Sequence, residues 1–274
     1  MSKQAPCQFC GRTKWCSVAI DGSIAICMHV SEGARTTTRN GGYLHILKPG
    51  IKSPGAVSMP ALRIPTDFTK TVEHLLQHTG QESIAALAQM LGLRDPAPLR
   101  TLRMFWDPSA RAWGFPMSDA QGLIVGIRYR NARGGKFAAK GSQNALFVPS
   151  GALEQPGPLY LPEGPTNSAA LLQLGLRVVG RACAKMTSRH LLQLCRLLDV
   201  VVVADPDKAG REGARALASD VRLVAKSVRI IEPPAECGDA RDWVTKFGAR
   251  VEDVTARALA ATPLQLRLAG RDDG

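Results

Sequence analysis

The sequence predicts a chain of mixed α+β and α/β class, in which a small cysteine-rich module precedes a larger domain with a mostly parallel sheet. Three observations support this prediction. Four of the seven cysteines fall within the first 27 residues. Apolar and polar positions alternate over residues 103–148, which is typical of antiparallel hairpins. After residue 156, short apolar runs alternate with helical stretches, which indicates parallel strands with covering helices.

Composition limits the classes of protein that the sequence can encode. The 274 residues are 45% hydrophobic and 21% charged, so the chain can bury a core. A net charge of +12 favours polyanionic partners, although a basic protein without such a partner fits the charge as well. No run approaches the roughly 20 apolar residues that span a bilayer, so we expect no membrane role. The start has no apolar signal region, which predicts a cytoplasmic protein with reduced or metal-bound thiols.

Changes of pattern along the chain predict its domains. Apolar residues spaced by three and four positions predict two short helices between Phe68 and Leu91. We expect strands of the parallel sheet at residues 159–161, 176–179, 200–204 and 228–231. The predicted segments are a metal-binding module at 1–48, a Pro- and Gly-rich linker at 49–66, a basic subdomain at 67–150, a strand–helix domain at 151–262 and a tail at 263–274.

The first group with a chemical function is a set of metal ligands. Cys7 and Cys10 form a knuckle, and Cys16, Cys27 and His29 follow within 23 positions. We expect the four cysteines to close a tetrahedral, structural zinc site in a zinc-ribbon module, with His29 as substitute for one of them. Ordinary buried cysteines are a poor alternative, because this stretch is too short and polar to bury them without a metal.

Zinc alone does not say what the module binds. Charged and aromatic side chains nearby could contact a single nucleic-acid strand. They could equally form a solvated face with one core tryptophan. These residues are Arg12, Lys14, Trp15, Arg35 and Arg39.

Carboxylates follow the predicted strands of the larger domain. Glu163 comes after the first strand, Asp205 and Asp207 come after the buried third strand, and a later loop holds Asp239 and Asp242. Because the carboxyl ends of parallel strands meet at one edge of a sheet, these side chains can converge and hold one or two Mg²⁺ ions. Asp205 and Asp207 alone would be better explained as a capped turn, but three acidic clusters at successive strand ends are not.

These segments resemble the three ordered motifs of the Toprim domain, which is shared by primases, topoisomerases and some nucleases. The resemblance covers about residues 155–250 and rests on Glu163-Gly164, Ala204-Asp205-Pro206-Asp207-Lys208-Ala209-Gly210-Arg211 and Asp239-Ala240-Arg241-Asp242. The basic subdomain that precedes Toprim in phage primases is similar to Gly126-Ile127-Arg128-Tyr129-Arg130, Lys136-Phe137, Lys140-Gly141 and Ala145-Leu146-Phe147. With the cysteine module first, the order is that of a phage- or plasmid-type DNA primase.

The resemblance implies an activity and a role for each site residue. It implies RNA primer synthesis on single-stranded DNA from ribonucleoside triphosphates, with Mg²⁺ or Mn²⁺ as catalytic ion. Glu163 would assist proton transfer, and Glu163, Asp205, Asp207 and Asp239 would bind magnesium, with Asp242 as the alternative to Asp239. Nucleotide phosphates or template would be held by Arg128, Arg130, Lys136, Lys140, Lys208 and Arg211, which equally fit ordinary solvated charges.

The sequence departs from the family pattern and leaves alternatives open. Asn167 stands where the first motif usually continues to an aspartate, and Cys16 interrupts the two-pair zinc spacing of many primases. No Gly-x-x-x-x-Gly-Lys-Ser/Thr phosphate loop occurs, so we expect a separate replicative helicase as partner. A Toprim nuclease would use the same carboxylates. A non-catalytic, single-strand-binding replication adaptor is motivated by Asn167.

Overall fold

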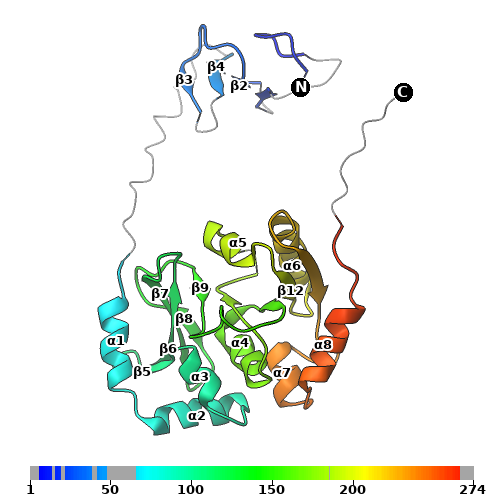
Figure 1. Ribbon diagram of the computed structural model, residues 1–274. Helices are drawn as coiled ribbons and strands as arrows, with labels where there is room; N and C mark the ends of the chain where they lie inside the picture. The colour runs from blue at the N-terminus through cyan, green and yellow to red at the C-terminus, as the bar shows by residue number, and fades with distance from the viewer. Residues whose placement is uncertain are drawn as a thin grey trace. The chain divides into compact units, whose positions relative to one another are not determined.

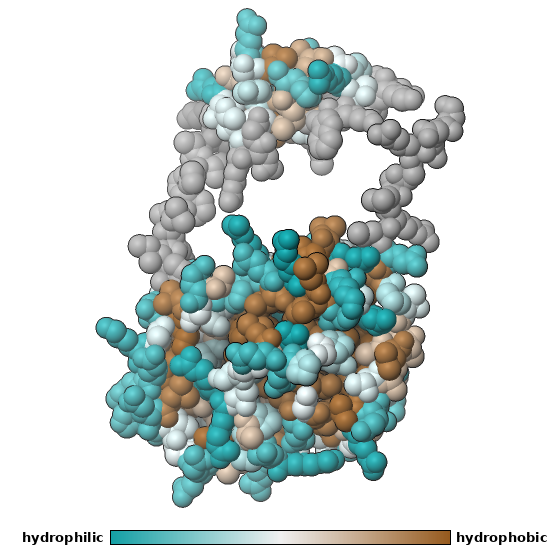
Figure 2. All heavy atoms as spheres, in the orientation of Figure 1, coloured by the Kyte–Doolittle hydropathy of each residue, from teal (hydrophilic) through white to brown (hydrophobic). Residues whose placement is uncertain are grey.

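The computed structural model describes residues 6–13, 16–19, 22–38, 42–47, 66–184 and 186–265. The chain divides into two compact units, residues 1–64 and 65–274, which are drawn in Figure 1. The predicted linker up to residue 65, Lys14, Trp15, Arg39 and the tail beyond residue 265 lie outside the described residues. Among the described helices, none combines the length and the apolar character that a membrane span requires. Hydrophilic side chains cover much of the visible face of the larger unit (Figure 2).

The smaller unit is built on a short antiparallel sheet. Its strands, in the spatial order β1-β2-β4-β3, are β1 (Ser17–Val18), β2 (Ile24–Cys27), β3 (Thr36–Thr37) and β4 (Tyr43–Ile46). The buried His45 of β4 stacks on Phe9, with ring centroids 3.7 Å apart, and its Nε2 bonds the carbonyl of Val30 at 3.0 Å. Among the described residues of this unit, the other buried side chains are mainly cysteines, which offer too little apolar surface to stabilise a domain of this size without a metal.

The first half of the larger unit packs helices against an antiparallel sheet. The helices are α1 (Thr69–Gln77), α2 (Gln81–Leu91) and α3 (Ala97–Thr101). The strands run in the order β11-β9-β6-β7-β8, with β5 paired to β6; their bounds are β5 (Phe105–Asp107), β6 (Ala112–Ser118), β7 (Ile124–Asn131), β8 (Lys136–Ala138), β9 (Leu146–Phe147) and β11 (Gly180–Arg181). The two predicted helices and the predicted β6–β7 hairpin are present, and α3 is an addition.

The second half is a three-stranded parallel sheet with helices on both faces. Its strands are β10 (Leu159–Leu161), β12 (Asp199–Val203) and β13 (Ser227–Ile231), with β12 in the centre. The helices are α4 (Gly164–Gln173), α5 (Arg189–Cys195), α6 (Lys208–Val221), α7 (Ala240–Thr245) and α8 (Val251–Ala260). Val200 and Val202 pack with α5 and α6, whereas Val201 and Val203 pack with α4, α7 and α8. This burial on both faces explains the uninterrupted valine run of β12.

The segment at residues 176–179, predicted as a parallel strand, lies parallel to β10 but is too short to form a full strand. Only Val178 of that segment forms a bridge, to Tyr160, and the chain then enters β11, which pairs antiparallel with β9. The chain therefore passes from one sheet to the other at this point. A Cβ atom on Gly180 would lie 2.3 Å from the Oγ of Ser168, so a glycine is needed where the segment meets α4. The next residue, Arg181, forms a parallel bridge with Glu163 and therefore lies beside that carboxylate.

A buried hydrogen bond joins Tyr129 of β7 to Asp107 of β5, and we expect it to stabilise the folded protein. The hydroxyl of Tyr129 donates to Oδ2 of Asp107 at 2.6 Å. Tyr129→Phe would leave that carboxylate oxygen without its donor, so we expect the free energy of unfolding to fall by about 1–3 kcal/mol, measured by urea denaturation. Tyr160→Phe is the matched control, because Tyr160 is also a buried residue and its hydroxyl has no hydrogen bond to a described residue. Equal losses in both variants would contradict the prediction.

Candidate active site and cysteine cluster

Acidic residues lie where strands of the parallel sheet pass into helices. Glu163 follows β10 at the N-cap of α4, and Asp205 follows β12. Asp207 caps α6, with Oδ1 accepting the Gly210 N–H at 2.6 Å. Asp239 caps α7 in the same way, with Oδ1 2.7 Å from the Asp242 nitrogen. The strand-to-helix turns therefore fix the carboxylates at one end of the sheet.

These carboxylates share a cavity with cations from the antiparallel sheet. The cavity has a volume of about 480 Å³, and its charged lining residues are Glu163, Asp205, Asp239, Arg128, Arg130 and Lys136. Arg130 of β7 lies directly opposite Lys136 of β8, so both side chains are on the same face of the sheet. The Nε of Arg130 is buried without a hydrogen-bond partner. The cavity thus brings carboxylates and guanidinium groups to one space, the arrangement that a metal-bound polyphosphate requires.

The electrostatics of the cavity favour a bound cation. Burial, together with the charges of Glu163, Asp239 and Asp207, raises the pKa of Asp205 from its ordinary value to about 6. Burial also raises the pKa of Glu163, against the opposing effect of Arg181. Carboxylates that repel one another in a partly buried site are stabilised when a divalent ion binds between them.

Arg181 is a charged neighbour of the acidic site that the sequence analysis missed. Its side chain is buried, with 1% exposure, and Nη1 donates to the carbonyl of Ala184 at 2.8 Å. Its positive charge opposes the rise that burial causes in the pKa of both Glu163 and Asp205. The available signal was an arginine two positions after the apolar run at Leu176–Val179, but only the parallel pairing of this segment with the end of β10 places it beside the carboxylates.

Asn167 of α4 connects the acidic turns. Its Oδ1 accepts the main-chain N–H of Arg241 at 3.2 Å, and its Nδ2 donates to Oδ1 of Asp205 at 3.2 Å. The first bond fixes the orientation of the amide, because a main-chain N–H requires an oxygen acceptor. The side-chain oxygen of Asn167 is therefore directed to α7.

Some residues predicted for the site lie outside the cavity. Lys140 and the exposed Asp207 do not line it, and Lys208 is 4.0 Å from Glu212 on the surface of α6. Arg211 lines a different cavity of about 500 Å³, where its Nε lies 2.9 Å from Oε2 of Glu232. The structure thus brings together only part of the predicted phosphate-binding set.

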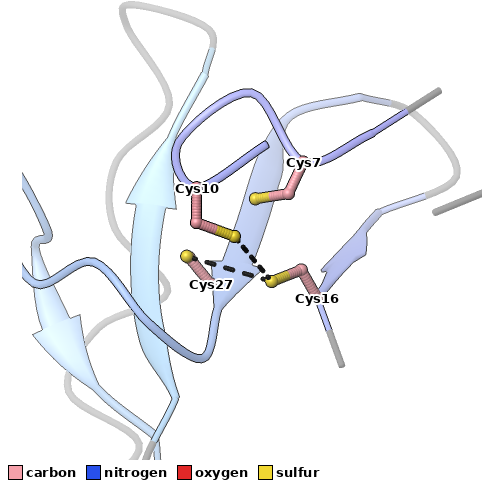
Figure 3. Close-up of side chains that lie close together, drawn as sticks. All are labelled: Cys7, Cys10, Cys16 and Cys27. Carbon is pink, nitrogen blue, oxygen red and sulfur yellow. Dashed lines mark hydrogen bonds between the residues drawn. The ribbon is translucent and has the colours of Figure 1, made fainter. Parts of the chain in front are cut away.

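The four cysteines of the smaller unit form a compact cluster. Their sulfur atoms all lie within 4.8 Å of one another (Figure 3). The Sγ of Cys16 is 3.6 Å from that of Cys10 and 3.9 Å from that of Cys27. Tetrahedral zinc with bonds of about 2.3 Å requires sulfur separations of about 3.8 Å. The chemistry and spacing of Cys7, Cys10, Cys16 and Cys27 therefore fit a structural zinc ion.

The contacts of His29 indicate that its ring is not one of the metal ligands. The main-chain nitrogens of His29 and Val30 each donate to Sγ of Cys27 at 3.4 Å. The exposed His29 ring instead lies near Arg12, with 3.4 Å between Nδ1 and Nη1. Within the described residues, the cysteines are the one group of three or more ligands that meets this closely, so no three of the carboxylates do.

Comparisons with known proteins identify the fold. No protein-family model and no curated protein sequence matches the chain. Among solved structures, the Escherichia coli primase catalytic core is 18% identical, with a TM-score of 0.54 over 71% of this chain and 79% of that one. A DnaG primase catalytic domain bound to single-stranded DNA is 18% identical, with a TM-score of 0.55 over 71% and 78%. The zinc-binding and RNA polymerase domains of Aquifex aeolicus primase are 16% identical, with a TM-score of 0.57 over 70% and 60%.

These similarities define the class of fold. The mixed α/β architecture resembles that of primase catalytic cores, and a four-cysteine cluster precedes it in the chain. At such low sequence identity the likeness shows the fold alone.

Proposed function

We propose that the protein is a Toprim-type DNA primase, of the kind found in phages and plasmids, that makes short RNA primers on single-stranded DNA. The observation that carries the proposal is the cavity itself, in which carboxylates at parallel strand ends face cations of an antiparallel sheet. Its occurrence in a fold that resembles primase cores supports nucleotidyl transfer over other phosphate chemistry.

The residues of the cavity would divide the chemistry between them. A bound Mg²⁺ or Mn²⁺ would neutralise charge on the phosphates during transfer. Asp205 and Asp207 would hold the ion, and Glu163, whose pKa is raised, would assist proton transfer. Arg128, Arg130 and Lys136 would hold the triphosphate or the template. Outside the cavity, the nucleic-acid strand at a greater distance from the reacting groups would be contacted by Lys140, Lys208 and Arg211.

We also propose a set of domains and partners for this primase. Zinc would stabilise the module of residues 1–48, followed by the linker, the basic subdomain at 67–150, the Toprim domain at 151–262 and the tail. The ligands would be single-stranded DNA and ribonucleoside triphosphates, with a separate replicative helicase. The structure of a primase domain bound to single-stranded DNA supports the first of these.

Primer synthesis from labelled ribonucleotides on single-stranded DNA tests the proposal. We expect short products with Mg²⁺ or Mn²⁺, and a loss of about a hundredfold or more in Glu163→Gln, because the variant keeps the shape of the side chain but not its charge. Glu154→Gln, an exposed position outside the cavity, is the matched control and should be unaffected.

Two other outcomes distinguish the alternatives. Degradation of labelled DNA without added nucleotides, lost in the same Glu163→Gln variant, would identify a nuclease. Salt-dependent strand binding with neither synthesis nor cleavage would identify a replication adaptor and overturn the proposed activity.

A further inference from the structure

A cavity of about 310 Å³ lies between the parallel sheet and α8. Tyr160 of β10, Val201 of β12 and Arg229 of β13 pair side by side in register, so their side chains line the cavity from one face of the sheet. Asp199 lines it at the start of β12, whereas Asp205 lines the active-site cavity beyond the end of that strand. No lining residue is common to the two cavities.

Two polar side chains of this cavity keep hydrogen-bond donors that the protein does not use. Nη1 of Arg229 donates to Oγ of Ser227 at 3.1 Å, but Nε is buried without a partner. Tyr160 is 2% exposed, and its hydroxyl has no hydrogen bond to a described residue. Burial raises the pKa of this phenol, so at neutral pH the hydroxyl is protonated and can donate. A bound acceptor would therefore stabilise both side chains.

The positive charge of the cavity is not neutralised by its lining. Asp199 is the acidic residue of the lining, and its oxygens already accept from Oγ of Ser227 at 2.6 Å and Nζ of Lys226 at 3.0 Å. Within the described residues, no carboxylate forms an ion pair with Arg229. Arg177 adds a second guanidinium, which is fixed by hydrogen bonds to main-chain carbonyls of the loop before β10. The cavity is therefore suited to an anion.

We propose that this cavity binds a small organic carboxylate, whose charged group meets Arg229 and the hydroxyl of Tyr160. A planar guanidinium matches the geometry of a carboxylate. The volume is at the lower end of that of ligand pockets, so the ligand is small. Its body is apolar, because most of the remaining lining is apolar, and inorganic phosphate would leave that surface uncovered. The apolar lining residues are Pro156, Pro158, Leu176, Val201, Ala258 and Leu259.

Titration of the full-length, zinc-loaded protein with benzoate tests this site without using primer synthesis. In ¹H–¹⁵N correlation spectra, we expect signals of β10, β13 and α8 to shift, with a Kd of about 1 mM or below. Benzamide, which has nearly the same shape but no charge, should bind about tenfold more weakly, and so should inorganic phosphate. Benzamide or phosphate binding as tightly as benzoate would overturn the assigned ligand class. Absence of shifts around the cavity would overturn the site.

Variants of the lining give the second arm of the experiment. Arg229→Gln should weaken benzoate binding about tenfold or more, and Arg215→Gln, at an exposed position of α6 outside the lining, is its matched control. Leu259 lines the cavity but is 79% exposed, so substitution there should keep the fold. Leu259→Glu should weaken binding about fivefold or more relative to Leu259→Gln, because the new charge repels the carboxylate. Benzoate affinity that is unchanged in both Arg229→Gln and Leu259→Glu would overturn the proposal.

Discussion

Asp205→Asn is expected to abolish primer synthesis while making the metal-free protein more stable. The carboxylate lies at the end of the central strand β12, among Glu163, Asp207 and Asp239, whose charges disfavour its ionisation. Under the proposed function, Asp205→Asn would remove a charged ligand of the ion, and we expect activity to fall by about a hundredfold or more. The amide oxygen of the substituted side chain can still accept the hydrogen bond from Asn167, so the fold should be kept.

The stability gain follows from the direction of the pKa shift. Because the fold raises the pKa of Asp205 to about 6, the folded state binds this proton more tightly than the unfolded state does. In the unfolded chain the pKa of this aspartate is about 4. The free energy of unfolding of the metal-free protein therefore falls as the pH rises from about 4 to about 6, and the whole loss is present above about pH 6. The variant cannot ionise at this position, so we expect a gain of at most about 2–3 kcal/mol at pH 8.

Thermal unfolding of the larger unit in chelator, at pH 4 and pH 8, measures this effect. The variant should exceed the wild type at pH 8 and differ little from it at pH 4. Added Mg²⁺ should raise the Tm of the wild type more than that of the variant. Asp220→Asn on the exposed end of α6 is the control and should change neither activity nor the pH dependence. A variant less stable than the wild type at pH 8 would show that the ionised Asp205 carboxylate does not destabilise the folded protein.

Removal of zinc is expected to unfold the smaller unit and to leave the larger one folded. The buried side chains around the cluster are chiefly Cys7, Cys16 and Cys27, and burial raises the pKa of Cys16 to about 12. Without a metal ion, the folded unit would bury these thiols beside little other apolar surface, so the burial would contribute little to the free energy of unfolding. Structural zinc sites of this type supply most of the folding free energy of small modules.

Zinc content and ¹H–¹⁵N correlation spectra of the full-length protein check this expectation. Cys27→Ser, or treatment with a strong chelator, should collapse the signals of the smaller unit to unfolded positions and leave those of the larger unit in place. His29→Ala is the matched control, because the ring is near the cluster but not within it. It should retain one zinc ion per chain. Loss of zinc in His29→Ala would assign the histidine to the ligand set.

Local patterns in the sequence determined the elements that carry the site. The alternation of residues 112–130 predicted the β6–β7 hairpin, and the valine run predicted the buried strand β12. The position of Asp205 after that strand predicted a carboxylate at the sheet edge. Cysteine spacing predicted which sulfur atoms meet. Each of these signals depends on residues close together in the chain, where backbone geometry restricts the possible arrangements.

Only the tertiary structure decided which distant side chains meet at the site. A parallel bridge between Arg181 and Glu163 places the buried guanidinium beside that carboxylate, and no local pattern in the sequence shows which strand this segment joins. The orientation of Asn167 likewise depends on Arg241, 74 positions away. The strength of a hydrogen bond or of a charge interaction depends on the distance between the groups in space and not on their separation in the sequence. The tertiary packing therefore determines which side chains meet at the site, and the order of the motifs does not.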